Sequence, residues 1–236
     1  MIYDNYYDHM TTLPKVAVWL ERQRNERIAD WILNNACVKI NSVLEIGPGA
    51  GLFAEVCKQR GWDYTCVERN AKIADALTRR YNTISAEIPP MPDALKGRKF
   101  DLVYAAYVVE HLADGLMVFD FVQQLQSLLA PGGQLVLVVP DSLSLGLELW
   151  NQDYTHRYPT SWRNMTYALR DAKYNNIQLI KYRGSGWIGW RRLLLKVVSA
   201  FYSYPVLMSI FRGKAWPYSL YQYIAMEALV FMARKN

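Results

Sequence analysis

The chain has 236 residues, of which 52% are hydrophobic and 20% are charged, a composition that excludes a disordered protein and allows one domain with a substantial core. Its net charge is +6, but residues 181–236 hold nine Lys and Arg side chains against one acid, Glu227. That segment is therefore +8 and residues 1–180 are −2, which argues against a nucleic-acid groove across the body of the domain.

Residues 1–40 predict an N-terminal helical cap. Within it, residues 15–35 place apolar side chains such as Val16 and Leu20 between charged ones, which is the pattern of an amphipathic helix. Pro14 suits the first turn of that helix. We expect the helix to cover the mouth of a cofactor or substrate site, and the residues before it to be either part of a lid or a frayed terminus.

Beyond the cap, apolar runs and helical patterns alternate along the chain. The predicted strands cover residues 43–46, 63–67, 83–85, 100–105, 133–139, 176–183 and 222–233, and the predicted helices cover 50–59, 70–80, 115–130 and 160–173. Strands separated by helices predict a parallel sheet with helices on both faces. The predicted fold class is α/β, a doubly wound, seven-stranded and mostly parallel sheet in a single domain over residues 1–236.

The first predicted strand leads into three glycines at alternate positions, Gly47, Gly49 and Gly51. Glycines at a strand-to-helix turn allow positive φ and let the backbone approach a ligand closely. Their spacing, G-x-G-x-G, differs from the phosphate-cradling G-x-G-x-x-G. Glu45 lies two residues before the first glycine and would repel a pyrophosphate, so the pattern favours a cationic ligand without phosphate.

Glu45 and the three glycines match E-x-G-x-G-x-G, which resembles motif I of the class I S-adenosylmethionine-dependent methyltransferases. Three further segments resemble that family in the expected order: 64–68, 100–112 and 128–140. The resemblance covers about residues 40–182 and a last strand near the C-terminus, and it is greatest for the small-molecule types 11 and 23. It implies a Rossmann-like methyltransferase fold with an antiparallel last strand, and S-adenosylmethionine as the cofactor.

The resemblance also implies roles for individual residues. Glu45 and the glycine loop, Gly47 to Gly51, are expected to hold the methionine part of the cofactor. Glu68, the acid that ends the second strand, is expected to bind the ribose hydroxyls. The nearest match to the adenine contact is Glu87, and the expected neighbours of the sulfonium are Ala105 and Tyr107.

Methyl transfer is an in-line displacement, so the enzyme mainly aligns the acceptor, excludes water and removes one proton. The candidate bases are His111, in a Val-Glu-His-Leu segment, and His156, in the loop after the fifth strand, with Asp153 to orient His156. The Asp-x-Thr-His element resembles a loop in methyltransferases of cell-surface glycan and small-metabolite pathways. For both histidines the alternative is a structural hydrogen bond. Asp153 and His156 alone are too few ligands, so no metal site is predicted.

Residues 184–219 form an apolar and basic insert before the last strand. Its apolar stretch, 193–211, has about the length of a membrane span, but Lys196 and Pro205 interrupt it. Three alternatives remain open for the insert: packing on its own domain or in a homodimer, docking on a membrane surface or forming an apolar substrate channel, and spanning a bilayer. In the second case we expect the insert to cap the acceptor site.

The predicted function is transfer of a methyl group from S-adenosylmethionine to an oxygen or nitrogen of a small-molecule, sugar or lipid-linked acceptor. The Asn-Pro-Pro-Tyr type of motif found in nucleic-acid amino methyltransferases is absent after the fourth strand, so no nucleic-acid partner is expected. A non-catalytic methyltransferase-like scaffold or partner subunit is the alternative. A polar, acidic start and three cysteines, expected to be buried thiols, indicate a cytoplasmic protein, free or at the inner face of a membrane.

Overall fold

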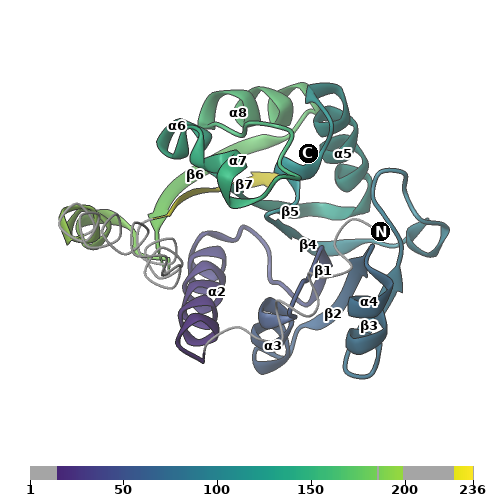
Figure 1. Cartoon of the computed structure of the whole chain (residues 1–236). Helices are drawn as coiled ribbons and strands as arrows, with labels where there is room; N and C mark the ends of the chain where they lie inside the picture. Colours follow the sequence, from purple (N-terminus) through teal and green to yellow (C-terminus); the bar gives the residue numbers. More distant parts are fainter. Residues whose placement is uncertain (1–14, 185, 199–225, 236) are drawn as a thin grey trace.

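The computed structural model describes residues 15–184, 186–198 and 226–235, and its centre is one twisted sheet (Figure 1). The strand order is β3-β2-β1-β4-β5-β7-β6. The strands are β1 (Ser42–Ile46), β2 (Asp63–Glu68), β3 (Asn82–Ser85), β4 (Phe100–Ala106), β5 (Leu129–Pro140), β6 (Asn175–Arg183) and β7 (Glu227–Arg234). β1 to β5 pair in parallel, whereas β7 runs antiparallel to both β5 and β6. The predicted doubly wound, mostly parallel sheet with an antiparallel last strand is confirmed.

Two layers of helices cover the sheet, one on each face (Figure 1). One layer holds α2 (Lys15–Asn35), α3 (Leu52–Gln59) and α4 (Ala71–Thr78), and the other holds α5 (Gly115–Leu128) and α8 (Trp162–Asp171). Each layer closes its own core, because side chains on alternate positions of the strands point to opposite faces. Short elements that we did not predict lie between them: η1 (Asp93–Leu95), η2 (Val109–His111), α6 (Ser142–Leu145) and α7 (Glu148–Gln152).

Two element boundaries differ clearly from the prediction, and the first lies between α5 and β5. The helix predicted for 115–130 ends at Leu128, and the strand predicted from residue 133 already begins at Leu129. Pro131 explains the early stop, because a proline pushes the residues before it from helical towards extended backbone. The last strand begins at Glu227 where we predicted residue 222, and residues 222–225 lie outside the described part.

The prediction of three buried thiols is wrong for one of them. Cys57 and Cys66 are buried, but Cys37 is exposed, because it lies in the surface connection between α2 and β1.

Helix α2 confirms the helix predicted for residues 15–35. It packs across α3, where Arg22 Nη2 lies 2.8 Å from Glu55 Oε2, and Asp30 Oδ1 accepts a 2.7 Å hydrogen bond from Arg60. The alternatives of a lid or a frayed terminus concern residues 1–14, which lie outside the described residues.

The described part of the insert projects from the sheet as a helix over residues 189–198 (Figure 1). Glu227 ties it to β7, because Glu227 Oε1 accepts hydrogen bonds from Arg183 at 3.0 Å and from Arg192 at 2.9 Å. Burial would raise the pKa of Glu227, but the hydrogen bond and charge of Lys181, together with Ser144 and Arg183, lower it to about 2. No helix within the described residues is both long and apolar enough to cross a bilayer.

Candidate active site

The glycine loop begins at the carboxyl end of β1, where the strand order reverses between β1 and β4. Gly47, Gly49 and Gly51 all have left-handed backbone, with φ of 68°, 51° and 72°. A Cβ on Gly47 would lie 2.9 Å from Val108 Cγ2, so the loop needs glycine for close approach as well as for conformation. Ligands of open α/β sheets bind at such a reversal, outside the carboxyl ends of the strands. The loop and the turn after β4 therefore meet at the expected cofactor position.

Glu68 ends β2 next to this loop and is buried. Its carboxylate accepts the backbone N–H of Asn70 at 2.8 Å and also that of Gly49. Burial raises the pKa of Glu68, and these backbone hydrogen bonds offset part of the increase. The acid predicted for the ribose thus lies against the glycine loop.

Glu45 lies inside the sheet layer rather than at its surface. It is 3% exposed, and Tyr64 donates a 2.5 Å hydrogen bond to its Oε2. Burial raises the pKa of Glu45 to about 8, with the charge of Glu68 adding to the effect and the Tyr64 bond opposing it. Glu45 and Glu68 are therefore close enough to interact, although the contact of Glu45 with the cofactor remains a prediction.

The remaining predicted cofactor residues occupy three different environments. Glu87 is exposed and pairs with Arg69, at 3.1 Å between Oε1 and Nη1. Ala105 is 1% exposed within β4, so its side chain belongs to the core. Tyr107 follows β4 with a left-handed φ of 57°, which is uncommon for a bulky residue, and its N–H donates to Val138 O at 2.8 Å.

Arg24 links helix α2 to this turn, a contact that we did not predict from the sequence. Its guanidinium carbon lies 5.2 Å from the centre of the Tyr107 ring. The hydroxyls of Tyr107 and Tyr182 lie 2.5 Å apart beside it. Helix α2 thus contacts the turn after β4 through Arg24, and its role as a cover for the mouth of the site remains a prediction.

The two candidate bases lie side by side, with ring centroids 4.9 Å apart. His111 Nδ1 is 3.0 Å from Thr155 Oγ1, and that hydroxyl donates a 2.6 Å hydrogen bond to Asp153 Oδ1. Since the Thr155 proton is used on Asp153, His111 Nδ1 must be the donor. Burial, together with the charge of His156, lowers the pKa of His111 to about 4. His111 is therefore neutral near pH 7, with its lone pair on Nε2.

His156 is oriented by a different group from the one we predicted. Its Nδ1 lies 2.5 Å from the carbonyl oxygen of Leu149, and a carbonyl only accepts, so Nδ1 carries the proton. Asp153 accepts both the N–H and the hydroxyl of Thr155 and acts on the two imidazoles through its charge. The other ring nitrogen, Nε2, is thus the candidate proton acceptor of His156.

Glu110 is the functional candidate that the sequence analysis missed. It is fully buried, and neither carboxylate oxygen has a hydrogen-bond partner among the described residues. Burial raises the pKa of Glu110 to about 8, with its own backbone N–H opposing and the charge of Asp153 adding to the increase. Donor atoms of Glu110, His111 and His156 all lie within 4.8 Å of one another. We call these three residues the Glu-His-His cluster.

The cluster forms because the loop after α7 folds back onto η2. The carbonyl of Glu110 accepts the N–H of Arg157 at 2.7 Å and of Tyr158 at 3.0 Å. The only sequence signal was that Glu110 and His111 are neighbours. Nothing in the sequence places His156, 45 residues later, beside them.

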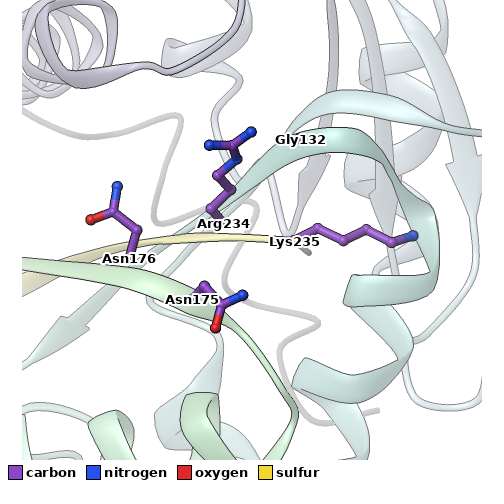
Figure 2. A pocket seen from close by; sticks show the side chains of 5 residues that line it. All are labelled: Gly132, Asn175, Asn176, Arg234 and Lys235. Atoms are coloured by element: carbon purple, nitrogen blue, oxygen red, sulfur yellow. The ribbon is translucent and has the colours of Figure 1, made fainter.

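A groove of about 320 Å³ lies at the opposite end of the sheet from the glycine loop, where β5 and β6 begin and β7 ends. Figure 2 shows that the side chains of Arg234 and Lys235 point in different directions there, and that Asn175 and Asn176 also diverge. No set of polar groups converges in this groove, so the cluster remains the candidate for chemistry.

Comparison with known proteins agrees with the fold described above. The family model described as a methyltransferase domain matches residues 20–181. Ubiquinone biosynthesis O-methyltransferase from Pseudomonas aeruginosa is 30% identical over 117 residues, which cover 46% of this chain and 48% of that protein. The match thus spans about half the length of that curated relative.

Solved structures share the fold at low sequence identity. A SAM-dependent methyltransferase from Archaeoglobus fulgidus superposes with a TM-score of 0.62 at 19% identity, over 89% of this chain and 92% of that one. The N-methyltransferase NodS from Bradyrhizobium japonicum, in complex with S-adenosylhomocysteine, gives 0.59 at 16% identity, over 92% and 88%. The chain belongs to the methyltransferase domain family, and the predicted class I S-adenosylmethionine-dependent methyltransferase, with that cofactor, is confirmed.

Proposed function

We propose that the protein transfers a methyl group from S-adenosylmethionine to an oxygen, or else a nitrogen, of a small-molecule, sugar or lipid-linked acceptor at the Glu-His-His cluster. One observation carries the proposal. Two imidazoles, each with Nδ1 engaged by a hydrogen bond, lie side by side in the segments that follow β4 and α7, and the turn after β4 approaches the glycine loop through Val108 and Gly47.

The chemistry needs one proton acceptor beside the methyl group. S-adenosylmethionine, held by the glycine loop and Glu68, would supply the methyl group and leave as the neutral thioether, and the proton of the acceptor hydroxyl would pass to His156 Nε2. His156 suits this role better than His111, whose lowered pKa makes it a weak base. The carbonyl of Leu149 would stabilise the imidazolium by accepting from Nδ1.

The similarity to the ubiquinone biosynthesis enzyme supports an oxygen atom and a lipid-linked acceptor. The exposed apolar helix of the insert supports the same choice, because an acceptor with a long apolar tail needs apolar protein surface to bind to. The described helix exposes Trp190 by 71% and Leu193 by 64%. We propose that the protein is cytoplasmic, either free or at the inner face of a membrane.

Incubation with methyl-labelled S-adenosylmethionine and a panel of hydroxylated and amine-bearing acceptors tests the function. The enzyme should transfer label to one class of acceptor and release S-adenosylhomocysteine in equal amount. A protein that binds S-adenosylmethionine but labels no acceptor, including those of the pathways encoded beside its gene, would support the scaffold alternative.

The insert is proposed to bind an anionic membrane surface and to cap the acceptor site. Its described helix combines Trp190, Leu193 and Val197 with Arg191, although Arg192 is engaged by Glu227. Each cation near an anionic surface contributes roughly 1 kcal/mol. Co-sedimentation with vesicles should therefore require anionic lipid and decrease with added salt.

Trp190→Glu should weaken this co-sedimentation at least about tenfold, because the lost burial of a large apolar side chain is worth roughly 1.5–3 kcal/mol. Leu116→Glu, on the exposed start of α5, is the matched control and should bind vesicles normally. If the intact protein ignores anionic vesicles and light scattering reports a homodimer that Trp190→Glu dissociates, the insert serves subunit packing.

A further inference from the structure

We propose that the Glu-His-His cluster is a binding site for one divalent first-row transition-metal ion, such as Zn²⁺, Co²⁺ or Fe²⁺. Two imidazole nitrogens and one carboxylate are a donor set that these ions favour. The binding of the ion can be measured without methyl transfer, but an ion on His156 Nε2 would replace the role of His156 as base, and the placement of the ion beside the methyl acceptor rests on the proposed function.

The first argument is the distance between the donor atoms. Ligand bonds of about 2.1 Å keep two donors on one ion within roughly 4.2 Å of each other. The donor atoms of Glu110, His111 and His156 already lie within 4.8 Å of one another. Small side-chain rotations therefore bring all three onto one ion without moving the backbone.

The second argument is the orientation of the two rings. Histidines that bind a metal usually donate their other ring N–H to a carbonyl, carboxylate or similar acceptor, which fixes the tautomer. His156 Nδ1 donates to the carbonyl of Leu149, and His111 Nδ1 donates to Thr155, whose hydroxyl donates in turn to Asp153. Both rings are thus held in the tautomer that a metal ion needs, with Nε2 as the ligand.

The third argument is the buried carboxyl of Glu110. Buried polar groups are paired in most proteins, and an unpaired one calls for an explanation. Glu110 is fully buried, and neither of its carboxylate oxygens finds a hydrogen-bond partner in the described part of the chain. A bound cation explains this burial, because it would compensate the negative charge where no protein donor does.

The ion would change the role of His156. A ring that binds a metal through Nε2 cannot accept a proton there, so the ion would supply an electrophilic position for the acceptor oxygen in place of a base. Methyl transfer with His156 as base needs no ion. Absence of metal binding would therefore remove this proposal and leave the proposed function standing.

Titration of tag-free, chelator-treated protein with Co²⁺ tests the site, because cobalt bound by nitrogen and carboxylate absorbs visible light. We expect one equivalent to bind and Zn²⁺ to displace it. Glu110→Gln should weaken Co²⁺ binding at least about tenfold, and Thr155→Val, which removes the hydroxyl that lies between His111 Nδ1 and Asp153, about tenfold. Glu148→Gln, an exposed acid on α7, is the matched control and should bind like the wild type.

Two results would overturn the proposal: no cobalt absorption at one equivalent, or equal Co²⁺ affinity in the wild type and Glu110→Gln. Titration with S-adenosylmethionine checks that each variant is folded and active in cofactor binding. All variants should bind it with the affinity of the wild type, because the cluster lies on the acceptor side.

Discussion

Replacing Gly49 by valine is expected to reduce S-adenosylmethionine affinity at least about 100-fold, or roughly 3 kcal/mol. Gly49 lies in the middle of the glycine loop with a left-handed φ of 51°, and its N–H is held by Glu68. A branched side chain there disfavours the left-handed backbone and occupies space that the cofactor needs. Isothermal titration with S-adenosylmethionine and S-adenosylhomocysteine measures the effect.

Gly61→Val provides the matched control. Gly61 also has a left-handed φ, 70°, but a Cβ there meets nothing within 4 Å, and it lies in the turn before β2, away from the glycine loop. The control should therefore lose a similar amount of stability and keep its cofactor affinity. Equal affinities in the wild type and Gly49→Val would show that the loop does not hold the cofactor.

His156→Ala is expected to lower kcat by about 10²- to 10³-fold, the usual contribution of a positioned base, while cofactor affinity stays unchanged. The reason is that His156 acts only on the acceptor. A lower kcat at unchanged cofactor affinity and unchanged thermal stability separates a role in the chemistry from a structural role.

Tyr154→Phe is the matched control for that loop, because Tyr154 is 81% exposed and two residues from His156. It should leave kcat and cofactor affinity unchanged. If His156→Ala retains wild-type kcat, or if both variants lose activity together with thermal stability, His156 has a structural role in the loop.

The fold was predictable because its signals are local. Alternating apolar runs and helices define the parallel sheet, and the left-handed backbone at Gly47, Gly49 and Gly51 requires the residues that the sequence supplies. The boundary error at Leu128 arose because the helical pattern continued past the point where Pro131 disfavours a helix.

The catalytic side was less predictable because its contacts join distant segments. Asp153 and His156 are close in sequence, yet the carbonyl of Leu149 orients the ring. A backbone carbonyl carries no signature in the residue types. Glu110 is buried because the loop after α7 packs onto η2, and this long-range contact exists only in the folded chain.

A crystal structure with bound S-adenosylhomocysteine tests the central claim most directly, because it measures the distance from the sulfur to His156 Nε2. If the methyl group reaches an acceptor oxygen and that oxygen contacts His156, the sulfur and His156 Nε2 lie within about 8 Å of each other. The account predicts the ligand against the glycine loop and Glu68, with its sulfur facing the Glu-His-His cluster at that distance. A ligand bound elsewhere, or a sulfur more than about 12 Å from both imidazoles with the intervening space filled by protein, would contradict it.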